Sequence, residues 1–356
     1  MTTSNKNSRF CFNNWVSNGT FSVSSSAAGY SADNLVSGIR SKVWQTGGLF
    51  EIDATNNKVY INATTYTVAV GSYTVATLIT AFNAATSQTL SRNGAGKFVI
   101  TLGGAGTFNF GTSTNAIWTA LGFLSVADVA GTVATADERR YSTSEWIKVD
   151  LGFPQIANFA ALIPPSNTAA SFPTATISLQ GNNTDTWAAP AVDLPMEVSS
   201  NGAFVAPDVT TSPCRYWRIK IVDVKNSALT AAVAYMGDSV INTNTNVATE
   251  FSRVRQDTSQ RLSSEGGQLY IQRGPRVMTL SNMNVYFLKA QELTDMEQLV
   301  YDLGTGRPFF ICIDPEQGVS SSLSQMTHYV EVEGDVTFSH VLASYYNLSF
   351  ALREVL

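Results

Sequence analysis

Strand-forming segments in the first two thirds of this chain stand on either side of a long segment of different character. Residues 34–46 (NLVSGIRSKVWQT), 144–152 (SEWIKVDLG) and 215–223 (RYWRIKIVD) carry the aromatic and aliphatic residues that favour strands. Residues 51–141 separate the first two. Because insertions are tolerated where a connection runs over the surface, this order predicts a β-sandwich interrupted by an inserted domain. A scaffold that carries an insert is typical of assembly and adhesion proteins.

The inserted segment has strand and helix patterns of its own. Leu78, Ile79 and Phe82 have helical spacing after a capping region at Ser72 and Thr74, and Gly122 ends a second short helix. The segment is therefore predicted to be a small α+β domain. Its strands are expected at residues 58–61, 66–70, 97–102 and 107–110, and its helices at residues 75–85 and 117–121.

A third folded unit is predicted after residues 241–250 (INTNTNVATE), whose composition is that of a linker. Residues 292–303 form the strongest helical pattern of the chain, with acidic residues in the first turn. Residues 308–313 (PFFICI) indicate a buried strand. The predicted domains are a sandwich of residues 1–50 plus 142–240, an α+β insert of residues 51–141, and a C-terminal α+β or β-sandwich domain of residues 251–356.

The charge content limits the partners of this protein. Charged residues make up 14% of the chain, against about 25% in an average soluble protein. The formal net charge is −5 and the sequence holds no basic stripe, so nucleic-acid binding is not expected as a main function. A polar but weakly charged surface suits large permanent contacts, because little charge has to be desolvated on association.

The cysteines and the apolar segments indicate neither disulfides nor a membrane span. Cys11, Cys214 and Cys312 are far apart and form no CxxC pair, so we expect buried free thiols. Residues 1–10 lack the apolar core of a secretory signal, and no apolar run reaches the roughly 18 residues of a membrane span. The protein is expected to be made in a cytoplasm and to act elsewhere when a particle carries it.

Read together, the strand segments resemble the discoidin-like (galactose-binding-like) jelly roll. The shared pattern runs NL…VWQT…SEWIKVDLG…ISLQGNN…RYWRIKIVD…AYMGDS, split around the insert. The resemblance implies that Trp44 and the two long strand segments pack the sandwich core. This chain lacks the terminal cysteine pair of the secreted animal members, so a disulfide-closed extracellular domain is not implied.

Two further segments resemble proteins of tailed-phage tails and baseplates. The insert shares with them the run TYTVAVGSYTVATLITAFN, a later FVIT strand and the ALGF segment at residues 120–123. In the C-terminal third, a helix leads to the segment GRPFFICIDP. These resemblances imply a virion protein of the tail tip, baseplate or neck.

No catalytic, cofactor or metal site is predicted. His328 and His340 are the two histidines, and they lie in a strand-rich region without HExxH or GxSxG spacing. The carboxylate pairs Asp137/Glu138 and Glu331/Glu333 suit solvated loops and strand faces better than glycoside hydrolysis, which is kept as a minor alternative. No calcium loop motif is present, although the discoidin-like resemblance leaves structural calcium open as an alternative.

Three aromatic residues are candidate contact sites. Trp187 and Phe204 are expected in loops (184–190 and 199–207), and Tyr30 lies near the first strand segments. Such residues anchor protein interfaces more often than they stack on sugars, and both alternatives are kept.

The combined expectation is a non-enzymatic structural subunit of a phage tail, at the distal tip or baseplate, localised in the virion. It would form a homo-oligomeric ring or trimer and dock to other tail proteins. The alternative is a carbohydrate-binding module for host attachment that touches host surface glycans with its sandwich loops.

Overall fold

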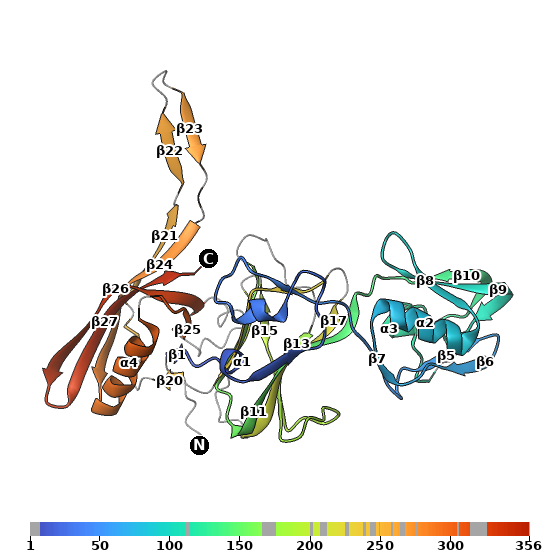
Figure 1. The fold of residues 1–356 in the computed structure, drawn as a ribbon, viewed down its shortest axis with the longest axis horizontal. Helices are drawn as coiled ribbons and strands as arrows, with labels where there is room; N and C mark the ends of the chain where they lie inside the picture. Colours follow the sequence, from blue (N-terminus) through green and yellow to red (C-terminus); the bar gives the residue numbers. More distant parts are fainter. Residues whose placement is uncertain are drawn as a thin grey trace.

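A computed structural model gives the fold of this chain. It describes residues 8–111, 114–165, 176–199, 202–206, 212–224, 228–237, 240–242, 247–248, 250–257, 259–263, 268–272, 274, 276–304, 306–313 and 326–355. The protein is mainly β, and the predicted fold class of an interrupted sandwich followed by a C-terminal domain is confirmed (Figure 1). Among the described residues, no helix has both the length and the apolar character needed to cross a membrane.

Two antiparallel sheets form the sandwich in the middle of the molecule (Figure 1). The five-stranded sheet has the order β14 (Val192–Pro195), β13 (Thr176–Asn182), β17 (Cys214–Val224), β11 (Ser142–Gln155), β2 (Thr20–Val23). The four-stranded sheet has the order β15 (Glu197–Ser199), β16 (Gly202–Val205), β12 (Phe159–Ile163), β19 (Val233–Gly237). Beside them lie α1 (Trp15–Asn18), the 3₁₀ helix η1 (Ala32–Val36) and the strand pair β3 (Trp44–Gln45) and β18 (Thr230–Ala231).

Alternating side chains of the five-stranded sheet form one half of the sandwich core. In β11, Ile147 and Val149 are fully buried, whereas Lys148 between them points to the outer face. Trp217 of β17 and Trp44 of β3 are also fully buried in this core. The segments that predicted the sandwich therefore supply its largest core side chains.

Three strands of the four-stranded sheet are buried on both of their faces. Every residue of β12 (FAALI), β16 (GAFV) and β19 (VAYMG) is buried. In β12, Ala160 and Leu162 face the five-stranded sheet, whereas Phe159, Ala161 and Ile163 face a second hydrophobic cluster. Strands covered on both sides need continuous apolar runs instead of alternation, which is what these three sequences provide.

A seven-stranded sheet of the C-terminal domain supplies the other side of that second cluster. Its order is β20 (Val240–Asn242), β1 (Arg9–Cys11), β25 (Phe309–Cys312), β26 (Thr327–Leu342), β27 (Tyr345–Glu354), β24 (Arg276–Leu288), β21 (Ser252–Asp257). Phe310 and Tyr329 point towards the four-stranded sheet, whereas Phe309 and Val330 point the other way. Helix α4 (Ala290–Leu303) packs in the core on this other side through Met296, Leu299 and Leu303.

The N-terminal strand lies in the C-terminal sheet. β1 pairs antiparallel with β25, with Phe10 opposite Ile311, and with β20 on its other edge. The expectation had placed residues 1–50 in the sandwich and had begun the linker at residue 241, which is inside β20. Alternation of apolar residues identifies a strand but does not specify its partner, because pairing joins residues far apart in the chain.

The inserted segment folds around its own core, apart from the sandwich (Figure 1). Its elements are β4 (Phe50–Ile52), β5 (Lys58–Ile61), β6 (Thr64–Thr67), β7 (Gly71–Tyr73), α2 (Val75–Thr86), β8 (Thr89–Arg92), β9 (Phe98–Phe108), α3 (Trp118–Leu121) and β10 (Val129–Thr135). Strands expected at 97–102 and 107–110 are one continuous strand, β9, because the intervening glycines stay extended instead of turning. β8 and β10, which were not predicted, pair with β9.

A buried carboxylate joins the insert to the sandwich. Glu145 of β11 is fully buried and accepts hydrogen bonds from the backbone N–H groups of Gly48 (3.2 Å) and Leu49 (2.9 Å). The hydroxyls of Ser24 and Ser25 donate to its other oxygen. Burial raises the pKa of this carboxyl, and the four donors oppose that shift. The segment entering the insert is thereby tied to the sandwich.

We expect Phe310→Ala to destabilise the sandwich and the C-terminal domain together. The Phe310 ring is 1% exposed, and its centroid lies 4.8 to 5.5 Å from the rings of Phe159, Tyr235 and Tyr329. Removing a buried phenyl ring costs about 3–5 kcal/mol of unfolding free energy. Urea unfolding measures the loss, and Phe153→Ala, at a ring that is 61% exposed, is the control. A loss below about 1 kcal/mol would contradict the described packing.

Candidate functional site

The three predicted contact aromatics lie in different environments. Tyr30 is 42% exposed in the segment before η1. Phe204 is 2% exposed and lies in β16, within the cluster between the sandwich and the C-terminal domain. The expected loop position of Phe204 is therefore wrong, and its ring cannot face a ligand. Its neighbours Ala203 and Val205 are also buried, which marks a strand covered on both faces.

Trp187 is held in place by charged neighbours. The guanidinium of Arg218 lies 4.1 Å from the centre of its ring, and its indole N–H donates to Asp185 (2.8 Å). Lys148 donates to the other oxygen of Asp185 (2.6 Å). Arg218 also donates to Gln180 (2.9 Å) and is 5% exposed, and this burial lowers its pKa. One face of the Trp187 indole therefore covers the buried guanidinium of Arg218, so the ring has a structural role.

An open cleft lies where β11 runs past the start of β2 and helix α1. It has a volume of about 540 Å³. Trp15, which is 3% exposed, belongs to the core beneath it, and Phe153 stands out at its edge with 61% of its surface exposed. The polar residues that line the cleft are Asn13, Asn18, Thr20, Asp150 and Gln155.

The carboxylate of Asp150 is held rigidly in this cleft. Arg215 donates from Nε to Oδ1 (2.8 Å) and from Nη2 to Oδ2 (2.9 Å), and the backbone N–H of Gly152 donates to Oδ1 (2.8 Å). The hydrogen bonds from Arg215 lower the pKa of Asp150 to about 2, so it is ionised at neutral pH. Gly152 has a φ of +77°, which favours glycine, and lies in the irregularly paired part of β11 between Asp150 and Gln155.

The cleft was not predicted from the sequence, although one signal was available. Phe153 stands between Gly152 and Pro154, directly after the alternating pattern of β11. An aromatic ring between two turn-forming residues at a strand end is placed at the surface more readily than in the core.

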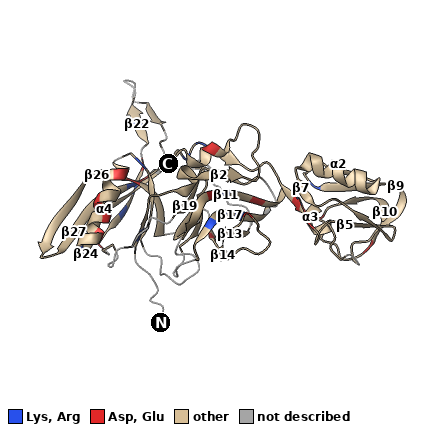
Figure 2. Cartoon of the chain, turned by 60° about the horizontal axis from the view of Figure 1, so that its bottom comes forward, with Lys and Arg blue, Asp and Glu red and all other residues tan. Residues whose placement is uncertain are grey.

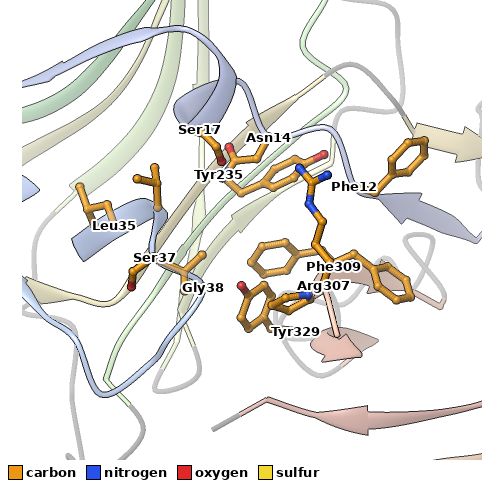
Figure 3. A pocket seen from close by; sticks show the side chains of 14 residues that line it. Phe12, Asn14, Ser17, Leu35, Ser37, Gly38, Tyr235, Arg307, Phe309 and Tyr329 are labelled. Atoms are coloured by element: carbon orange, nitrogen blue, oxygen red, sulfur yellow. The ribbon is translucent and has the colours of Figure 1, made fainter. Parts of the chain in front are cut away.

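A second, smaller cavity lies between the sandwich and the C-terminal domain. It has a volume of about 170 Å³, and Figure 3 shows Tyr235, Arg307 and Tyr329 among its lining side chains. Burial raises the pKa of the Tyr329 hydroxyl far above its usual range. Among the described residues that line it, no carboxylate, histidine or cysteine offers a general base or a nucleophile. Its lining comes from α1, η1 and β19 on the sandwich side and from β25 and β26 on the C-terminal side, so the cavity lies within the packing between the two units.

A projecting arm is the third candidate. We define the arm as residues 252–276, from β21 through β22 (Gln260–Ser263) and β23 (Leu269–Gln272) to the start of β24. It extends away from the body of the molecule (Figure 1). All residues of β21, β22 and β23 are exposed. Its exposed apolar side chains are Val254 (51%), Leu262 (56%), Leu269 (61%), Tyr270 (56%) and Ile271 (56%).

The other residues that were considered from the sequence as possible catalytic or metal sites make ordinary structural contacts. Asp137 accepts the backbone N–H groups of Leu124 and Ser125, and Glu138 pairs with Arg140 (2.8 Å). His328 and His340 both lie in β26. Glu331 lies opposite Arg353, and Glu333 lies two residues further along the same strand. The three cysteines are buried free thiols, as predicted. The described part of the chain holds no group of three or more His, Cys, Asp or Glu side chains suited to a metal ion.

The solved structures similar to this chain include two lectins. The lectin domain of lectinolysin, complexed with Lewis B antigen, is 12% identical with a TM-score of 0.30, over 63% of this chain and 96% of that one. An F-lectin (fucolectin) from the serum of striped bass, Morone saxatilis, is 10% identical with a TM-score of 0.29, over 97% of this chain and 96% of that one. At these scores neither likeness carries a functional argument. No family model and no curated protein matches the chain.

We expect Asp150→Asn to remove a pH-dependent part of the stability. The folded pKa of about 2 lies below the ordinary value of 3.8, so the ionised pair stabilises the fold above pH 3.8. This contribution disappears as the pH falls from 3.8 towards 2. Urea unfolding between pH 2 and 6 should therefore show a gap between wild type and variant that closes with acid. Arg215→Gln should give the same profile, and a gap that does not vary with pH would contradict the pairing.

Proposed function

We propose that this protein is a non-enzymatic structural subunit of a tailed-phage virion, at the tail tip or baseplate, that assembles with copies of itself and docks to neighbouring tail proteins. The observation that carries the proposal is the exposed arm. Residues 65–83 and 306–315 resemble segments of phage tail proteins, and this resemblance is the reason for assigning the protein to a virion.

The arm has the properties of a segment that is completed by a partner. Leu262 lies opposite Tyr270 on one face of the hairpin, and Arg261 lies opposite Ile271 on the other, so both faces carry apolar surface. A two-stranded hairpin is marginally stable in water by itself. Its outer edges also present unpaired backbone groups that favour pairing with another chain. An apolar hairpin held away from the body therefore supports an assembly role.

The rest of the molecule supports the same role. The sandwich and the C-terminal domain share the cluster around Phe310, which makes them one body. The insert and the arm extend from this body in different directions (Figure 1). Two projections on a rigid centre let one subunit reach several neighbours.

We expect removal of the arm to reduce the protein to a monomer. Asp257 lies directly opposite Arg276, so residues 258–275 can be replaced by Asn-Gly, which closes a two-residue hairpin at that register. Light scattering over a range of concentrations should give a discrete oligomer for the wild type and a monomer for the shortened chain.

Point variants provide the matched comparison. Leu262→Ser combined with Tyr270→Ser removes one apolar face of the arm and should weaken assembly. Ile39→Ser, at an apolar position of the body that is 46% exposed, should not. A wild-type chain that stays monomeric at every concentration would overturn the proposed self-assembly.

A second function, recognition of a neutral glycan, is favoured by the cleft beside Phe153. An exposed aromatic ring can cover the apolar face of a sugar, and the fixed carboxylate of Asp150 can accept hydrogen bonds from sugar hydroxyls. The volume of about 540 Å³ falls in the range of small-molecule sites. This cleft is a glycan site separate from Tyr30 and Trp187, whereas Phe204 is buried.

We expect Phe153→Ala to abolish glycan binding without unfolding the protein. A glycan array with the purified protein, followed by titration calorimetry, measures the effect. Phe287→Ala, at a ring that is 50% exposed in the C-terminal domain, is the control and should bind as the wild type does. Absence of any bound glycan, or equal binding by both variants, would rule out this function at the cleft.

A further inference from the structure

We infer that the arm of one copy docks on the outer face of helix α4 in the next copy, so that the subunits associate head to tail. This inference rests on the proposed self-assembly and names the surface that receives the arm. It is carried by the charges and the exposed apolar side chains of these two parts of the chain.

The arm is basic within an acidic chain. Residues 252–276 contain five arginines and two acidic residues, whereas the whole chain has a net charge of −5. Arg253, Arg255 and Arg261 are exposed. Strand alternation and the pairing of Arg261 with Ile271 place Arg261, Leu269 and Ile271 on the same face of the hairpin. This face therefore combines a cation with aliphatic surface.

Helix α4 has the complementary surface. Residues 290–303 (AQELTDMEQLVYDL) contain four acidic residues and no basic one, and Figure 2 shows acidic residues along this helix. Met296, Leu299 and Leu303 face the sheet, whereas Thr294, Glu297, Gln298 and Tyr301 form an exposed stripe at helical spacing. The Tyr301 side chain is 85% exposed. An aromatic ring within an acidic face suits a basic, aliphatic hairpin.

The arm cannot use the helix of its own chain. It joins the start of β24, whereas α4 follows the other end of the same strand. Figure 1 shows the arm extending away from the body while α4 lies along the seven-stranded sheet. The acceptor must therefore belong to another copy.

Pairing of two arms with each other is the less favourable arrangement. It would bring two basic segments together, and like charges across an interface oppose association. Contact between an arm and a helix is heterologous, because each copy gives one surface and receives the other. Such contacts generate a ring when the rotation closes.

Charge reversal tests the contact. Arg261→Glu or Glu297→Arg alone places like charges at the interface, and each variant should assemble at least about tenfold more weakly than the wild type at low salt. A mixture of the two variants should assemble, because each arm then meets an opposite charge on the other chain. The double variant, which carries both changes, should also assemble by itself. Asp335→Arg, at an exposed acidic residue of β26, is the control and should assemble normally.

The outcomes separate this inference from the proposed function. Light scattering of each single variant, of the mixture and of the double variant gives the masses. Restoration in the mixture and in the double variant supports contact between arm and helix. Normal assembly of both single variants overturns the inference, while the shortened-arm chain still decides whether the arm is needed. Loss in both single variants without restoration overturns it as well.

Discussion

Burial of β12, β16 and β19 on both faces is the constraint on which the rest of this structure depends. β12, β16 and β19 place small and aliphatic residues such as Ala160 and Leu162 against the five-stranded sheet, and large rings such as Phe159 and Phe204 against the C-terminal sheet. Each fully buried large apolar side chain contributes about 1.5–3 kcal/mol relative to exposure. The stack of three sheets, with α4 packed in the outer core, follows from this double burial and makes the sandwich inseparable from the C-terminal domain.

Two parts of the chain, the insert and the arm, project from this rigid stack of sheets. The insert has its own core and meets the sandwich at Glu145, whose four hydrogen bonds tie the entering segment in place. The described strands of the arm, β21, β22 and β23, are exposed throughout, and the hairpin carries apolar residues on both faces. Because the apolar faces of the body's sheets are buried against one another, we expect the insert and the arm to make the contacts with other molecules. Their different chemistry, a folded domain and an open hairpin, suits different partners.

Local sequence patterns predicted the individual strands and helices more reliably than they predicted which strands lie next to each other. Alternation in β11 and the helical spacing in α2 and α4 were correct because they depend on residues close in the chain. β9 was predicted as two strands because its glycines resemble a turn, although pairing with β8 and β10 keeps the strand extended. Phe204 was predicted in a loop because serine and proline flank it, whereas burial from both sides makes it a strand residue. In the cleft, Phe153 gave a local signal, but Asp150 needed the fold, since Arg215 lies 65 positions away.

The sequence by itself determined the mainly β class, the interruption of the sandwich by an insert, the buried thiols and the low charge content, because composition and periodicity act over short distances. The tertiary structure alone decided which strands pair. It brought β1 to β25 across some three hundred residues, covered the second face of β12, and left β21, β22 and β23 of the arm exposed. Strand pairing and double burial join residues that are remote in the chain, and no local pattern of one strand specifies the surface that will cover it.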